Sequence, residues 1–207
     1  MMRKLALTAA TAVLWPFATN AAPDYSYLQA DWIADGEAET ELVSGDHDYD
    51  GWAVEIAVAL GDHLFFRSAY ENLSVDDFGG ARTLSTGLGM HYAIGNPDTG
   101  LDLYGLLTHE NLETNGDSGD GYGVTAGARW QIMPQWELNP SIGYVDYGDI
   151  DSLNGDTSGM RYGIRSVYAV NDLLSVNLGY RMTELDSDGQ DIDLKNELRL
   201  GLRIDVE

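Results

Sequence analysis

Two histidines with carboxylate neighbours are the residues whose types could support catalysis. His47 stands between Asp46 and Asp48, and Glu110 follows His109. A carboxylate beside an imidazole can orient it for general-base chemistry. No serine is adjacent to His109, and the sequence offers no identifiable partner that would complete a nucleophilic site. The pattern therefore favours exposed loop polarity, and no catalytic residue is assigned.

An aspartate series overlaps the first histidine and could bind a hard cation. Asp46, Asp48, Asp50 and Gly51 match the D-x-D-x-D-G start of a calcium-binding loop. The glutamate required at the twelfth position is replaced by Ala57, which excludes an EF-hand. Oxygen ligands still suit Ca²⁺ or Mg²⁺, so a weaker metal site at the three aspartates stays open. No other cofactor is expected.

Charged residues also recur at alternate positions of otherwise apolar segments. The final stretch, 194–206, carries leucine, isoleucine and valine on one parity and three basic residues on the other. This period of two predicts a strand with opposed faces. The charges predicted to share the polar face are Asp31, Glu55, Arg67, Glu71, Arg129, Glu137, Arg161, Arg165, Arg181, Lys195, Arg199 and Arg203.

The N-terminus resembles a signal peptide. A short basic region is followed by a mostly apolar run and a small-residue exit, which predicts cleavage after residue 21 and one domain over 22–207. The sequence has no cysteine, which excludes disulfides, thiolate metal sites and a lipidated cysteine. Its formal net charge of -23 makes nucleic acid an improbable partner.

The elements that position these charges are ten amphipathic segments separated by turn residues. Short connections alternate with longer, mostly acidic ones, at 35–50, 74–82, 112–121, 148–158 and 184–192. This alternation is typical of an antiparallel up-and-down barrel with both termini at one end. Ten strands are predicted, with eight as the alternative. Their ranges are 25–34, 51–60, 64–73, 83–94, 101–111, 122–132, 136–147, 159–170, 173–183 and 193–206.

The composition of the two faces decides which one points inward. One parity carries bulky residues such as Trp52, Leu88 and Tyr144, whereas the other carries glycine and most of the charge. A narrow barrel has little interior room, so the glycine-rich face fits inside. The bulky face must then contact lipid, which favours a transmembrane barrel over a soluble lipocalin-like one. Aromatic residues near both ends of the strands predict two rings that bracket an apolar band.

This pattern resembles the small outer-membrane β-barrel proteins of Gram-negative bacteria, the porin-like relatives of the OmpA and OmpX transmembrane domains. The resemblance covers everything after the signal peptide, and it departs from the family at the C-terminus, where Val206 and Glu207 replace the usual outward aromatic residue. It implies export to the outer membrane, with lipid and lipopolysaccharide as surroundings. It also implies that periplasmic chaperones and the barrel-assembly machinery act during biogenesis.

The function predicted from the sequence is a non-enzymatic surface or structural role in which acidic loops are presented outside the cell. The alternative is a narrow diffusion pore, since cationic residues of the last three strands would face Asp31, Glu55 and Glu71 across the lumen. A lumen filled by such pairs is favoured, because unpaired internal charges are costly and a ten-stranded barrel is narrow. A loop-side hydrolase of the omptin type is the third possibility, by analogy of fold alone.

Overall fold

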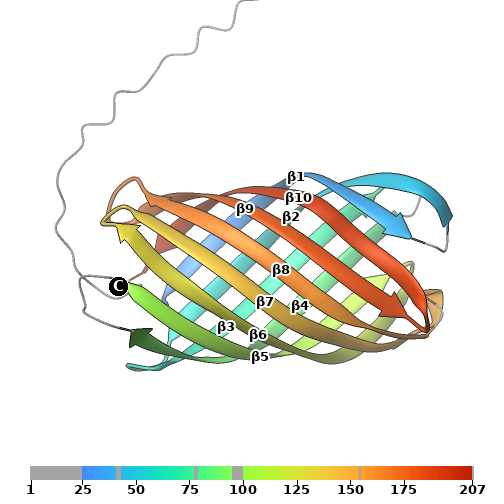
Figure 1. Cartoon of the computed structure of the whole chain (residues 1–207), viewed down its shortest axis with the longest axis horizontal. Helices are drawn as coiled ribbons and strands as arrows, with labels where there is room; N and C mark the ends of the chain where they lie inside the picture. The colour runs from blue at the N-terminus through green and yellow to red at the C-terminus, as the bar shows by residue number, and fades with distance from the viewer. Residues whose placement is uncertain (1–24, 41–42, 77–78, 95–99, 154, 207) are drawn as a thin grey trace, which may run out of the picture.

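The computed structural model describes residues 25–40, 43–76, 79–94, 100–153 and 155–206. These residues form one closed antiparallel barrel in which each strand pairs with its sequence neighbours and β1 pairs with β10 (Figure 1). The prediction of a transmembrane-type barrel with ten strands is thus confirmed, and the alternative of eight strands is wrong. Among the described residues, no helix is long and apolar enough to cross a membrane. The predicted signal peptide, 1–21, lies outside the described residues.

Every predicted strand is present, and most extend further than predicted at the end opposite the chain termini. The strands are β1 Tyr27–Thr40, β2 Val43–Ala59, β3 Leu64–Val75, β4 Gly79–Ile94, β5 Leu101–Thr114, β6 Asp117–Met133, β7 Trp136–Ile150, β8 Gly155–Ala169, β9 Leu174–Ser187 and β10 Gln190–Asp205. A 3-10 turn, Asp151–Leu153, follows β7. We call the end with the longer connections the hairpin end, and the end with the short turns and Tyr25 the turn end.

Two of the predicted loops are tight hairpins instead. Thr114 pairs with Asp117 across Asn115 and Gly116, and Ser187 pairs with Gln190 across Asp188 and Gly189. All four turn residues have positive φ, between 49° and 90°. Asn-Gly and Asp-Gly favour this two-residue turn because its twist matches that of the flanking strands. The expectation of loops over 112–121 and 184–192 was therefore wrong, and much of both segments extends the barrel wall.

Side chains alternate between lipid and lumen as the two faces predict. Large apolar residues on the outer wall remain exposed, including Leu88 at 60%, Met90 at 65% and Tyr92 at 67%. Charged residues on the inner wall are buried, including Glu55 at 6% and Arg199 at 6% exposure. Apolar side chains outside and paired charges inside are the reverse of a water-soluble barrel.

Glycines on the inner wall make room for large neighbours. A Cβ at Gly89 would overlap the Phe65 ring, and a Cβ at Gly127 would overlap the Tyr104 ring. A side chain at either position would therefore displace an aromatic ring from the lumen. Glycine on this face is thus a packing requirement, which explains why it shares a parity with the charges.

Apolar side chains fill both ends of the lumen. At the hairpin end, two clusters both contact Ala81; they consist of Leu112, Val145, Tyr147, Ile150 and Leu185, and of Ile33, Ala38, Tyr49 and Leu73. At the turn end, Tyr25, Phe65 and Leu106 form a third cluster that also contacts Tyr104. We call these clusters the two apolar closures. The ion pairs of Glu55 and Glu71 lie between them, whereas the pair of Arg129 and Glu137 lies beside the closure around Tyr25.

Candidate functional site: the lumenal ion-pair network

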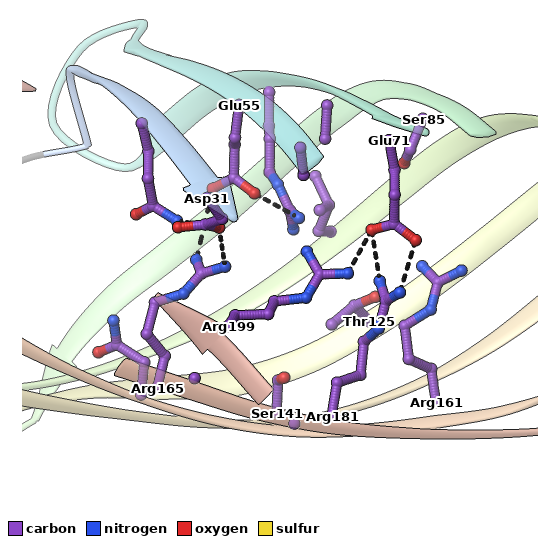
Figure 2. Close-up of a pocket in the computed structure, with 18 of the residues that line it drawn as sticks. Asp31, Glu55, Glu71, Ser85, Thr125, Ser141, Arg161, Arg165, Arg181 and Arg199 are labelled. Atoms are coloured by element: carbon purple, nitrogen blue, oxygen red, sulfur yellow. Dashed lines mark hydrogen bonds and ion pairs between the residues drawn. The ribbon is translucent and has the colours of Figure 1, made fainter. Parts of the chain in front are cut away.

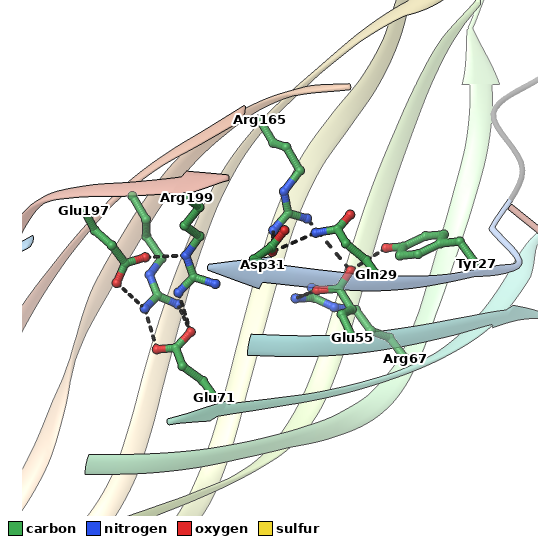
Figure 3. Close-up of polar contacts among 10 residues, drawn as sticks. Tyr27, Gln29, Asp31, Glu55, Arg67, Glu71, Arg165, Glu197 and Arg199 are labelled. Atoms are coloured by element: carbon green, nitrogen blue, oxygen red, sulfur yellow. Dashed lines mark hydrogen bonds and ion pairs between the residues drawn. The ribbon is translucent and has the colours of Figure 1, made fainter. Parts of the chain in front are cut away.

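Glu71 on β3 is the centre of the first ionic group in the lumen. Its carboxylate accepts hydrogen bonds from Arg181 at 2.5 and 3.0 Å and a further one from Arg199 (Figure 2). Glu197 lies beside Glu71 and Arg199 (Figure 3), and it accepts hydrogen bonds from Arg181 at 2.7 Å, from Arg199, and from the Tyr49 hydroxyl at 3.1 Å. Two carboxylates and two guanidinium groups thus neutralise one another away from water. Removing either partner of such a set leaves a buried charge uncompensated.

A second group links β1, β2, β3 and β8. Arg165 donates to Asp31 at 3.1 Å, and Arg67 lies 2.8 Å from Glu55. Glu55 also accepts from the Tyr27 hydroxyl at 2.5 Å. Arginines on one side of the lumen therefore face carboxylates on the other, as Figure 2 shows for Arg161, Arg165, Arg181 and Arg199 opposite Asp31, Glu55 and Glu71. Arg165, Arg181 and Arg199 thus form ion pairs across the lumen, which narrow any water path.

A third group lies toward the turn end. Arg129 binds Glu137 through two hydrogen bonds of 2.7 and 2.9 Å. The Arg129 guanidinium also lies over the Tyr25 ring at 4.7 Å, and Arg203 lies over the Tyr27 ring at 4.0 Å. Bidentate arginine–carboxylate pairs fix orientation as well as charge. This group therefore joins the ionic interior to the apolar closure around Tyr25.

An internal cavity of about 170 Å³ separates the walls of the network. Thr125, Ser141 and Glu110 line it together with the arginines of β8 to β10. Such a volume has room for several water molecules, each of which occupies ~30 Å³ in the liquid. The interior is thus a polar chamber rather than a continuous wide channel.

A stretch of the chain matches a known family of outer-membrane proteins. The family model of the Opacity family porin protein matches residues 102–168, from β5 through β8. An outer-membrane channel from Pseudomonas putida F1 shares 11% identity at a TM-score of 0.53, covering 93% of this chain and 98% of that one. The chain has the fold of the porin-like outer-membrane β-barrels. At this identity, the likeness to the channel shows a shared fold and nothing more about solutes.

Other solved structures resemble the porin-like barrel less closely in shape. Neisserial surface protein A has 14% identity and a TM-score of 0.43, covering 88% of this chain and 98% of that one. The KdgM porin has 8% identity and a TM-score of 0.40, covering 86% and 99%. No curated protein matches the sequence significantly.

Lys195 of the porin-like barrel lies apart from the lumenal groups to which the sequence assigned it. Its Nζ contacts Glu39 at 2.6 Å and Asp193 at 3.0 Å at the hairpin end of the wall. The pairing register shifts between Leu194 and Glu197, and Asn196 has a φ of 54°. This β-bulge reverses the alternation, so that Leu194 packs against the buried cluster around Ile33. Hydrogen bonds from Lys195 to Glu39 and Asp193 raise its pKa.

The histidines and aspartates singled out for chemistry lie at the hairpin end of the porin-like barrel. His109 is on the outer wall, where its Nε2 is 3.7 Å from Asp120 and its side chain is 66% exposed. Asp48 and Asp50 are exposed on β2, and the Asp46 side chain lies outside the described part of the chain. Among the described residues, no group of three potential ligands could hold a metal ion.

Sequence reasoning missed several lumenal residues of the porin-like barrel. Glu197 shares the parity of Arg199 and Arg203, so the alternation of β10 could have identified it. Glu110 is 2% exposed and faces inward on β5, but it was grouped with the neighbouring His109 as loop polarity. Asp102 is fully buried, with an oxygen 2.9 Å from His91 Nδ1. On β5 the inner face also carries Leu106 and Leu112, which hides the polar pattern.

Proposed function

We propose that this porin-like barrel is a non-enzymatic surface protein of the outer membrane, which displays acidic hairpins outside the cell and keeps its lumen closed. The observation that carries the proposal is the arrangement of the lumen, with apolar clusters toward both ends and paired charges in its interior. Dry apolar constrictions and ion pairs both oppose the passage of hydrated solutes.

The hairpin end is long enough to project from the membrane. Gly116 lies six residues beyond Tyr122, an outward aromatic residue at the edge of the apolar band. At ~3.3 Å per residue and a tilt of ~40°, the turn would stand about 15 Å beyond that edge. Exposed carboxylates cover this projecting part at Asp35, Asp48, Asp50, Glu113, Asp120, Glu184, Asp186 and Asp191. An acidic collar of this kind suits display rather than transport.

The same proposal includes export that depends on a signal peptide. It also includes periplasmic chaperones and the barrel-assembly machinery as partners during biogenesis. Lipid would surround the apolar band, and lipopolysaccharide would surround the acidic collar. Divalent cations would then bridge the collar carboxylates, including Asp48 and Asp50, to anionic groups of that layer. Each of these partners follows from the outer-membrane fold and the outward carboxylates.

A narrow pore is the second candidate function, because the lumen contains a cavity. Conductance measurements distinguish this pore from the closed barrel. Protein folded into planar bilayers should show no steady ohmic current, although its boiled and unboiled forms should migrate differently on a detergent gel. A steady current that scales with the number of inserted barrels would replace the surface role with the pore.

Surface display can be tested separately because the chain has no cysteine. Ser118→Cys, beside the β5–β6 turn, should react with a membrane-impermeant maleimide on intact cells. The matched variant Asp172→Cys, in a turn-end connection, should react only after the outer membrane is permeabilised. Equal labelling of both variants on intact cells, or labelling of Asp172→Cys alone, would contradict the proposed orientation.

A further inference from the structure

Glu110 and Arg161 are lumenal residues of opposite charge that belong to none of the three ionic groups described above. Glu110 is 2% exposed; its Oε1 accepts hydroxyls from Ser85 and Thr108 at 2.7 and 2.6 Å, while its Oε2 is buried without a partner. Arg161 donates to the Tyr147 hydroxyl at 2.6 Å, and its Nε has no partner. Within the described part of the chain, neither has an ion pair within 4.0 Å. Buried charges normally have one.

Both side chains border the same cavity. Glu110 is level with Gly121 on β6, and Arg161 is level with Gly143 on β7. Arg161 reaches the hydroxyl of Tyr147, which follows Asp146 on β7, and Asp146 is level with Tyr122, the residue after Gly121. Opposite charges thus approach the cavity from two sides without meeting.

The wall between them carries small residues. Gly121, Gly123 and Thr125 follow one another on the inner face of β6, with Ser141 and Gly143 beside them on β7. Thr125 and Ser141 line the cavity and appear beside the arginines in Figure 2. The glycines give room to their neighbours, since a Cβ at Gly123 would meet Thr108 and Glu110. The cavity between the anion and the cation is therefore bordered by hydroxyl groups, in contrast to the direct pairs around Glu71.

The geometry points to a binding site for a small zwitterion in this cavity. Its anionic carboxylate or phosphate group would bind Arg161, and its ammonium group would bind Glu110, with Thr125 and Ser141 hydrogen-bonding the part between. A zwitterion satisfies both charges at once and brings no net charge into the lumen. A simple anion or cation would satisfy one and leave the other uncompensated. The cavity volume limits the ligand to the size of a small amino acid.

Binding would also affect the closure at the hairpin end. Tyr147 belongs to the apolar cluster with Leu112 and Ile150, and Arg161 is bound to its hydroxyl. A ligand anion would compete with that hydroxyl for the guanidinium. Because the ligand must pass an apolar closure, its association should be much slower than diffusion.

The test uses the full mature protein folded in detergent micelles and isothermal titration calorimetry. The probes are glycine, β-alanine, 4-aminobutyrate and 6-aminohexanoate, which vary the separation of the two charges. Acetate and methylammonium serve as half-ligands. One zwitterion should bind saturably, and both half-ligands should bind at least about tenfold more weakly, since hydrogen bonds to charged groups are each worth that factor or more.

Variants locate the site. Glu110→Gln and Arg161→Gln should each weaken binding about tenfold or more. Glu113→Gln and Arg82→Gln are matched controls, since this pair lies exposed on the outer wall at 3.4 Å, and they should leave the affinity unchanged. Heat-dependent gel migration verifies that each variant is folded.

The site is refuted if no zwitterion of the series binds, or if acetate alone binds as well as the best zwitterion. Equal affinity of the parent and both lumenal variants would also refute it. Should a lumenal variant fail to fold, the comparison of zwitterions with half-ligands on the parent protein still decides. Conductance plays no part in this test, so its outcome is independent of the proposed surface role.

Discussion

Leu202 offers a quantitative test of where the membrane lies along the barrel. From Leu198 to Val206, the even-numbered side chains of β10 and the residue after it face outward. The eight steps from Leu198 to Val206 span about 20 Å vertically at ~3.3 Å per residue and a tilt of ~40°. Leu202 is at the centre of that span and is 56% exposed. Leu202→Arg should therefore cost about 2–4 kcal/mol of folding free energy, the penalty for a lipid-facing cation at the midplane.

Leu198→Arg is the matched control, because Leu198 pairs with Tyr180 at the edge of the apolar band. The same cation should cost only about 0–1 kcal/mol there, since it can reach the headgroups. The assay is reversible urea unfolding of both variants and the parent in lipid vesicles, followed by tryptophan fluorescence. A loss for Leu198→Arg equal to or greater than that for Leu202→Arg would show that the membrane band is misplaced. Unchanged stability for Leu202→Arg would show that β10 does not face lipid there.

Three further predictions concern the lumen and the hairpins. Glu71→Gln leaves Arg181 and Arg199 with Glu197 alone, so unfolding in vesicles should show a loss of about 3–5 kcal/mol, whereas Glu113→Gln at an exposed pair should change stability by no more than about 1 kcal/mol. Gly89→Leu should destabilise the barrel by about 1–3 kcal/mol through its clash with Phe65, while Gly105→Leu, where a Cβ meets open space, should be tolerated in the same assay. Gly189→Val places a β-branched residue at a φ of 85° and should increase proteolysis at the β9–β10 turn relative to Gln190→Val; equal cleavage of both would refute the tight turn.

The alternation of side chains made most of the fold predictable from the sequence. Because a strand has a period of two, Leu200 and Arg199 must face opposite sides wherever β10 pairs regularly. One face carries glycine and the other carries tryptophan and tyrosine, and this difference showed which face points into the narrow lumen. The hairpin tips were also encoded, by Asn115-Gly116 and Asp188-Gly189, but acidic composition around them was mistaken for loop.

The pairing of charges could not be predicted in the same way, because it depends on how the strands shift past one another around the barrel. Glu71 and Arg181 lie 110 residues apart and meet only across the closed lumen. A bulge at Asn196, the one residue that interrupts the apolar parity of 194–206, then reverses the face of Lys195. Glu110 is the converse case. Its position on β5 is regular, but no residue in the described part of the chain forms an ion pair with it. Period two therefore determines which residues enter the lumen, whereas register and bulges determine which of them are neutralised there and which stay available to a ligand.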